Sequence, residues 1–407
     1  MPLRYRARFG ATLRLATLGL AALGMAGLLA GCVTPPAAPG GANAVVALRP
    51  ARFADLPGWQ SDRLEPALAA FRASCAQMEG RDSLGGSGAT AAWGNPAAWQ
   101  PACTASASVA PGGARAFFEG WFQPYTLSDA GNAVGLFTGY YEPEVAGSRT
   151  QGGAYQTPLL ARPNDLVQVD LTPFADDLKG RHLTGRIEGG TLVPYYDRQQ
   201  IVAGALSRHR LELLWLSSPV DAFVLQIQGS GRVRLPDGHV VRVSYDGQNG
   251  RPYVPIGRVL ADMGQIPLSQ VSMQSITAWL NAHPDQAPQV MNRNPSYVFF
   301  REVEGLRSQE GPPGAMGAAL TPGRSAAVDR HFVPLGAPLF VATTDPVAQA
   351  PVQRLFVAQD VGGAIRGPVR ADLFWGWDQA AAQRAGLMHE TGRAWILLPR
   401  AAPTASR

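Results

Sequence analysis

The chain has 407 residues, of which 46% are hydrophobic and only 16% are charged, with a net charge of +5. This length allows about two domains with a sizeable core. No block of lysine or arginine lies outside the N-terminus, which argues against a nucleic-acid-binding arm and is compatible with an acidic polymer as substrate. The 46 glycines and 34 prolines follow no repeat period, so they indicate many turns and short strands.

The N-terminus has the pattern of an export signal. Residues 1–14 are basic, and residues 15–30 form an apolar run that is too short for a transmembrane helix of roughly 20 residues. The run ends in Leu29-Ala30-Gly31-Cys32, which resembles a bacterial lipobox. We expect residues 1–31 to be a lipoprotein signal peptide and Cys32 to be lipidated. The alternative is ordinary cleavage nearby, with Cys32 incidental.

The residues after this signal bear on location and on cysteine chemistry. Thr34 stands where an aspartate would signal inner-membrane retention, so the periplasmic face of the outer membrane is favoured. Residues 32–46 read as a flexible tether. In an oxidising compartment Cys75 and Cys103 are candidates for a disulfide, although two unpaired buried thiols stay possible. Nothing indicates a catalytic cysteine.

Further along the chain, the expected elements are mostly strands. We expect helices at 61–77, 113–122, 199–211 and 268–282. Residues 135–148 read as strand broken at Pro143, and residues 221–245 read as a hairpin that turns at Pro236-Asp237-Gly238. More strands are expected at 297–303, 338–344, 354–360 and 394–399. One short helix is expected before the last of these strands, with Asp378 as N-cap and Gly386 as C-cap. This pattern favours barrels.

Several common sites are disfavoured. The six histidines are scattered without zinc-ligand spacing, so we expect no metal and no cofactor. A triad of Ser325, His331 and Asp329 lacks the GxSxG elbow. The run 228–233, QGSGRV, lies inside the expected hairpin, so it does not predict dinucleotide binding. Its glycines instead indicate a bulge or close approach to a ligand.

The aspartates near the C-terminus are the best catalytic candidates. Asp372 precedes the apolar run Leu373-Phe374-Trp375-Gly376-Trp377, and burial against such residues raises the pKa of a carboxyl. A raised pKa is what a general acid needs near neutral pH. Asp360 is a natural neighbour. For each aspartate alone, a carboxylate that pins a turn is the competing interpretation.

The motifs FTGYYEPEVAGS, DAFVLQIQGSGRV, YDGQNGRPYVPIGR, MNRNPSYVFFR, GAALTPGRSAAVDRHFVPLGAPLF and QDVGGAIRGPVRADLFWGW occur in order between residues about 135 and 398. Together they resemble the membrane-bound lytic murein transglycosylases of the A type. The last two resemble the C-terminal three-aspartate (3D) domain, named for positions that match Asp329, Asp360 and Asp372.

The resemblance implies a mainly β fold with few helices. A double-psi β-barrel catalytic domain would be formed by residues 47–148 and 292–400, and a second, smaller β-barrel domain would be inserted at 149–291. The substrate groove would lie between the two barrels.

The resemblance also implies a reaction on peptidoglycan glycan strands. The β-1,4 bond between N-acetylmuramic acid and N-acetylglucosamine would be cleaved without water, leaving a 1,6-anhydro ring. Asp372 would act first as acid and then as base, Asp360 would orient it, and Asp329 would hold the groove. A tethered nucleophile explains why one acid can suffice, whereas a hydrolase needs a second carboxylate.

Matching positions imply a set of sugar-binding residues. Tyr140 and Tyr141 follow one another on a strand, so only one should face the groove, and Tyr141 is favoured over Tyr140, which core packing would explain. The full set is Thr138, Tyr141, Gln228, Gly229, Ser230, Gly231, Gly362, Gly363 and Ala364. Two alternatives stay open: an inverting glycoside hydrolase with an aspartate pair, and a non-catalytic peptidoglycan-binding lipoprotein.

Overall fold

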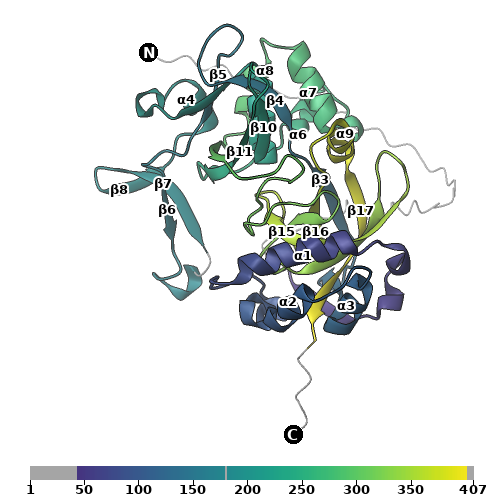
Figure 1. The fold of residues 1–407 in the computed structure, drawn as a ribbon. Helices are drawn as coiled ribbons and strands as arrows, with labels where there is room; N and C mark the ends of the chain where they lie inside the picture. The colour runs from purple at the N-terminus through teal and green to yellow at the C-terminus, as the bar shows by residue number, and fades with distance from the viewer. Residues whose placement is uncertain (1–43, 179–180, 401–407) are drawn as a thin grey trace, which may run out of the picture. The chain divides into compact units, whose positions relative to one another are not determined.

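A closed ring of strands organises the computed structural model, which describes residues 44–178 and 181–400 (Figure 1). The predicted signal peptide and Cys32 lie outside the described residues. The helices are α1 (Glu65–Met78), α2 (Gln100–Ala107), α3 (Ala114–Trp121), α4 (Arg198–Val202), α5 (Pro219–Gln228), α6 (Ile256–Asp262), α7 (Met273–Ala282), α8 (Ala287–Asn292) and α9 (Gln379–Leu387).

The strands outnumber the helices. They are β1 (Val46–Pro50), β2 (Phe122–Asp129), β3 (Gly135–Tyr140), β4 (Glu144–Ser148), β5 (Thr157–Leu160), β6 (Val167–Asp170), β7 (His182–Glu188), β8 (Thr191–Pro194), β9 (Glu212–Leu216), β10 (Ser230–Arg234), β11 (Val240–Gln248), β12 (Val298–Val303), β13 (Ser325–Val328), β14 (Pro338–Thr344), β15 (Pro351–Val361), β16 (Arg370–Phe374) and β17 (His389–Pro399).

The first barrel joins both ends of the described chain. Its strands follow the order β17-β14-β15-β13-β16-β3, and β3 pairs again with β17, which closes the ring. Two neighbouring pairs, β13–β15 and β16–β3, are parallel. The expected double-psi β-barrel is confirmed, with β3 supplied by the N-terminal part and the other strands by the C-terminal part.

The second barrel lies between these parts in sequence. Its strands follow the order β12-β11-β10-β4-β9-β5, and a parallel bridge from Ala161, directly after β5, to Phe300 in β12 joins the two edges. It therefore includes β4 before, and β12 after, the predicted insertion of 149–291, whose boundaries stay a prediction. Strands β6, β7 and β8 form a separate antiparallel sheet.

Three N-terminal helices pack beside the first barrel, as Figure 1 shows for α1, α2 and α3. Phe71 of α1, Phe118 of α3 and Phe122 of β2 are fully buried and belong to the same apolar cluster as barrel strands β14, β15 and β17. A disulfide joins Cys75 of α1 to Cys103 of α2. The N-terminal helices thus complete the core of the barrel.

One sequence prediction assigns the wrong type of element. Residues 219–228 are not the first strand of a hairpin but helix α5, because Ser218 caps its first amides, Pro219 begins it and Gly229 ends it with φ of 77°. Most of α5 is buried, so its sequence carries no clear period. The hairpin itself is β10–β11.

The other differences lie at helix ends. Helix α4 ends at Val202, and only a short 3-10 turn continues the range predicted as 199–211. Asp378 caps α9 as predicted, with its carboxylate accepting from the amide of Ala381 at 2.7 Å. Gly386 lies inside α9, and Met388 follows as the C-cap.

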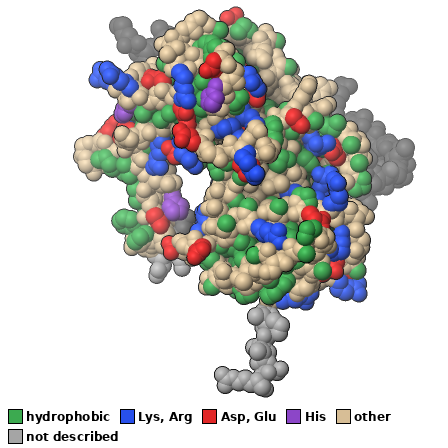
Figure 2. Space-filling view, in the orientation of Figure 1, with side chains coloured by type: hydrophobic (Ala, Val, Ile, Leu, Met, Phe, Trp, Pro, Cys, Tyr) green, Lys and Arg blue, Asp and Glu red, His purple; other side chains and the backbone are tan. Residues whose placement is uncertain are grey.

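Charged side chains are interspersed on the face seen in Figure 2, where blue and red side chains lie among one another. The most buried charges lie where the chain passes from the first barrel to the second. Glu142 is fully buried and accepts hydrogen bonds from Arg232 and Arg242, at 2.9 and 2.8 Å. Its amide donates to the carbonyl of Gly376, beyond β16. This cluster connects the two barrels.

We predict that Glu142→Gln destabilises the protein strongly, because it leaves two buried guanidinium groups without a counter-charge. Breaking such a buried pair costs about 3–5 kcal/mol. The control is Glu144→Gln, which breaks an exposed pair with Arg234 worth less than about 1 kcal/mol. Urea unfolding of the mature protein measures both. Equal losses from the two variants would contradict the importance of the cluster.

Candidate active site

One row of residues crosses four strands of the first barrel. Ala327 of β13 lies opposite Asp360 of β15 on one side and opposite Asp372 of β16 on the other. Asp372 in turn lies opposite Thr138 of β3. Adjacent strands are about 4.8 Å apart, so the backbones of the two aspartates are separated by roughly 10 Å. The ladder therefore brings the two predicted carboxyls together.

Asp372 is held by a hydroxyl rather than by a cation. The Thr138 hydroxyl donates to Oδ1 of Asp372 at 2.8 Å, and the Arg370 guanidinium donates to that same hydroxyl at 2.9 Å. Burial raises the pKa of the Asp372 carboxyl above its usual value, although the charge of Arg370 and the Thr138 hydrogen bond oppose the rise. The raised pKa has the direction expected for a general acid.

The carboxylate of Asp360 accepts more hydrogen bonds than that of Asp372. Its carboxylate accepts from the amide of Ala315 at 2.9 Å and from the hydroxyl of Tyr140 at 3.0 Å. Burial raises the pKa of Asp360 to about 6, the hydrogen bonds from Ala315, Val361 and Tyr140 lower it, and the charge of Asp372 raises it further. The two carboxyls therefore influence each other.

Asp329 lies at the end of β13 and is buried. Its Oδ1 accepts from the amide of His331 at 3.1 Å, and its Oδ2 accepts from the amide of Gly367 at 2.9 Å. Its carboxylate thus ties the segment after β13 to the loop between β15 and β16. This geometry agrees with a structural use of Asp329 beside the two other aspartates.

The loop that carries Gly362, Gly363 and Ala364 connects β15 to β16. Gly363 and Ala364 are exposed, and a side chain at Gly363 would meet no atom within 4 Å. A turn closes the loop, since the amide of Ile365 donates to the carbonyl of Gly362 at 3.0 Å. The backbone of this loop is open to a ligand.

The predicted residues of the second barrel meet the first at Tyr141. Gln228, the last residue of α5, accepts from the amide of Tyr141 at 3.1 Å through its Oε1. Gly229 ends the helix, and Ser230 and Gly231 begin β10 and are buried. Tyr141 is partly buried, and burial, together with the charge of Asp221, raises its pKa.

Sequence reasoning missed two contacts of the carboxyls. Tyr140 packs its ring against Phe374, with ring centroids 5.2 Å apart, as core packing predicts, yet its hydroxyl reaches Asp360. Arg370 lies two residues before Asp372 and acts through Thr138. The strand register is what brings Tyr140 to Asp360 and Arg370 to Thr138. Parity along β16 could have indicated that Arg370 and Asp372 share a face.

Other site classes find no support in residues 44–178 and 181–400. No cluster of histidine, cysteine, aspartate and glutamate there could hold a metal ion. The Ser325 hydroxyl donates to Gln359 rather than to His331. The segment 228–233 follows a helix and enters a strand, which is the reverse of a phosphate-binding loop.

Comparison with known proteins agrees with this geometry. Residues 136–301 match the family model of the MltA specific insert domain, and residues 324–398 match that of the 3D domain. The chain is 33% identical over 268 residues to the membrane-bound lytic murein transglycosylase A of Escherichia coli K12, covering 64% of this chain and 65% of that protein. The aligned part thus spans less than two thirds of this curated relative.

Solved structures extend the similarity. The membrane-bound lytic murein transglycosylase from Agrobacterium tumefaciens is 32% identical, with a TM-score of 0.76 over 87% of this chain and 98% of that one. The Escherichia coli MltA solved with bound chitohexaose is 27% identical, with a TM-score of 0.62 over 84% of this chain and 91% of that one.

The fold and the site define a double-psi β-barrel protein of the 3D-domain class, with two neighbouring carboxyls on one strand ladder. Within that class, the chain belongs to the family of membrane-bound lytic murein transglycosylases A.

The raised pKa of Asp360 predicts a pH-dependent stability. The folded state binds this proton more tightly than the unfolded chain, whose aspartates titrate near 3.9. The resulting stabilisation is complete below about pH 4 and is lost as the pH rises through about 6. Asp360→Asn removes the titrating carboxyl and with it this loss. The free energy of unfolding of the variant, relative to that of the wild type, should therefore rise by up to about 3 kcal/mol between pH 4 and pH 7.

Urea unfolding of both proteins at pH 4, 5, 6 and 7 measures this difference. Asp285→Asn, at an exposed position, controls for the loss of one carboxyl. If wild type and Asp360→Asn keep the same stability difference at every pH, then Asp360 does not titrate in this window.

Proposed function

We propose that this protein is a lytic transglycosylase that cleaves the β-1,4 bond between N-acetylmuramic acid and N-acetylglucosamine in peptidoglycan. The family supports this proposal, as does the chitohexaose bound to the Escherichia coli relative. The observation that carries it is the partly buried carboxyl of Asp372, whose pKa is raised and whose Oδ1 accepts a hydrogen bond from Thr138.

Asp372 acts twice in this mechanism. In its protonated form it gives a proton to the glycosidic oxygen, and the bond from that oxygen to C1 of the muramic acid breaks. The resulting carboxylate then takes the proton of the C6 hydroxyl as that oxygen bonds to C1, which closes the 1,6-anhydro ring. Because the hydroxyl belongs to the same sugar, its effective concentration is high and no activated water is needed.

Asp360 supports Asp372 rather than activating water. Its carboxylate already accepts from Ala315 and Tyr140, so few of its lone pairs are free to bind a nucleophile. The charge of Asp372 raises the pKa of the Asp360 carboxyl, so the two neighbouring carboxyls can share a proton. Tyr140 fixes the orientation of Asp360, and Asp329 fixes the loop through Gly367.

The glycan chain is bound by residues of both barrels. The loop Gly362–Ala364 offers open backbone on the first barrel. Tyr141 and Gln228 are joined by a hydrogen bond, and together with Gly229 they form a partly exposed surface across the two barrels, with Ser230 and Gly231 buried behind it. Tyrosine suits a sugar because it offers both a flat face and a hydroxyl.

We predict that Asp372→Asn abolishes lysis of purified sacculi, by at least about a thousandfold, because the amide can neither give nor take the proton. Its binding to sacculi should persist, since the amide keeps the hydrogen bond to Thr138. Turbidity measures lysis and co-sedimentation measures binding, with Asp285→Asn as control.

Mass analysis of the products separates the alternatives. Muramic acid ends in the 1,6-anhydro form are expected from the wild type. Reducing ends without any anhydro product would instead establish an inverting hydrolase that uses Asp360 and Asp372 as a pair. A wild type that binds sacculi but releases nothing would establish a binding lipoprotein.

We further propose that the protein is anchored through a lipid on Cys32 to the periplasmic face of the outer membrane. No helix within the described ranges is long and apolar enough to cross a membrane. The lipobox-like sequence before Cys32 and the Thr at position 34 support the anchor and the membrane.

We predict that Cys32→Ala moves the protein from the outer-membrane fraction to another fraction, because the acyl chains provide the membrane affinity. Fractionation and mass analysis of the mature N-terminus measure this change. A wild type that starts at a residue other than Cys32, or that carries no lipid, would overturn the proposal.

A further inference from the structure

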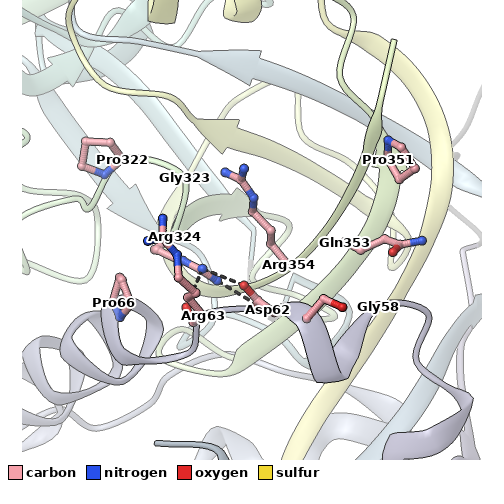
Figure 3. A pocket seen from close by; sticks show the side chains of 11 residues that line it. Gly58, Asp62, Arg63, Pro66, Pro322, Gly323, Arg324, Pro351, Gln353 and Arg354 are labelled. Carbon is pink, nitrogen blue, oxygen red and sulfur yellow. Dashed lines mark hydrogen bonds and ion pairs between the residues drawn. The ribbon is translucent and has the colours of Figure 1, made fainter. Parts of the chain in front are cut away.

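A cavity of about 410 Å³ has none of the candidate aspartates Asp329, Asp360 and Asp372 in its lining. Figure 3 shows the side chains that line it. Its lining comes from residues 58–66, 322–324 and 351–354. Arg354 precedes Asp360 by six positions along β15, which corresponds to roughly 20 Å of extended strand. The cavity is therefore separate from the candidate active site, although the same strand reaches both.

The lining carries more positive than negative charge. Arg63, Arg324 and Arg354 line the cavity together with one acidic residue, Asp62. The Asp62 carboxylate is already occupied, because Arg324 donates to it at 2.7 and 2.9 Å and the amide of Leu355 donates to it at 2.8 Å. Asp62 thus neutralises Arg324 and leaves two guanidinium groups.

Among the described residues, Arg354 and Arg63 are the two lining arginines that hold no carboxylate, and Arg354 is the one on the barrel strand β15. Within residues 44–178 and 181–400, no hydrogen bond or ion pair involves its guanidinium group, which faces the cavity. Two other arginines near Arg354 each hold a carboxylate: Arg324 binds Asp62, and Arg384 binds Asp345 at 2.7 Å. Partial shielding from solvent by the cavity wall, together with the charges of Arg324 and Arg384, lowers the pKa of Arg354. Arg63, Arg324, Arg354 and Arg384 thus share two carboxylates, those of Asp62 and Asp345.

The remaining walls suit an organic anion. Helix α1 begins beside the cavity, its N-cap Leu64 offers no side-chain cap, and Pro66 lines the cavity. Pro66 has no N–H to donate and Glu65 places a carboxylate in the same turn, so the helix end contributes apolar wall rather than an anion site. Prolines 66, 322 and 351 provide apolar wall, and Gln353 adds an amide. A volume of this size accommodates far more than a single inorganic ion.

We propose that this cavity binds a carboxylate of the short peptides carried by peptidoglycan, with Arg354 as its main partner. The planar guanidinium fork matches a carboxylate, as Asp62 on Arg324 already demonstrates in the same cavity. A peptide of about five residues reaches roughly 17 Å when extended, so it spans most of the distance from the active site. This inference rests on the proposed function, because it assumes that peptidoglycan is the substrate.

Arg354→Gln tests the proposal, because the Arg354 side chain reaches solvent and contacts neither Asp360 nor Asp372. Binding is measured in an Asp372→Asn background on glycan strands immobilised on beads, in two forms: carrying their peptides, and stripped of peptides by an amidase. We expect Arg354→Gln to weaken binding to the peptide-bearing strands about tenfold and to leave binding to the stripped strands unchanged. Arg208→Gln, at another exposed arginine, is the matched control.

Unchanged binding to both forms would overturn the proposal, as would an equal loss on both. Thermal unfolding provides a second measurement with acetate and inorganic phosphate as probes. Acetate should stabilise the wild type but not Arg354→Gln, and stabilisation by phosphate alone would overturn the assignment of a carboxylate. The proposed function is tested separately by the cleavage of peptide-free glycan strands with enzyme that keeps Asp372. That reaction does not need the cavity.

Discussion

The site depends on a single extra residue in β15. The ladder between β13 and β15 pairs Ala326 with Ala358 but Ala327 with Asp360, so Gln359 has no partner opposite it. Without this bulge, alternation along the strand would put Gln359 opposite Ala327 and turn Asp360 away from Asp372. The bulge therefore puts both carboxyls on one row with Thr138.

Gln359 is fixed by its own hydrogen bonds. Its side chain is fully buried, donates to the carbonyl of Ala70 and the hydroxyl of Ser74 at 2.9 Å, and accepts from the hydroxyl of Ser325. Ala70 and Ser74 belong to α1, one turn apart. The N-terminal helix thus stabilises the bulge that aligns the aspartates, which gives a helix far from the chemistry a part in the site geometry.

Much of this arrangement could be predicted from the sequence, for identifiable reasons. Asp372 stands directly before an apolar aromatic run, and the direction of its pKa shift follows from that position. Asp378 has a short polar side chain placed to cap α9. Such local signals need only neighbouring residues.

The remaining features depend on partners far away in sequence. Helix α5 is buried on most sides, so its apolar residues show no period that separates it from a strand. The contact of Tyr140 with Asp360 depends on the bulge at Gln359, and no local pattern marks the bulge. The relay from Arg370 through Thr138 joins two strands whose pairing is visible only in the folded barrel.

The closure of the first barrel has a consequence for biosynthesis. Thr138 and Asp372 lie 234 positions apart, and β3 reaches its second neighbour only in β17, at the end of the described chain. Contacts of such long range form late, because the intervening chain must first be ordered. A chain that is still being made or threaded through a membrane has no closed barrel. The buried acid therefore comes into existence only when nearly the whole polypeptide has arrived in one compartment.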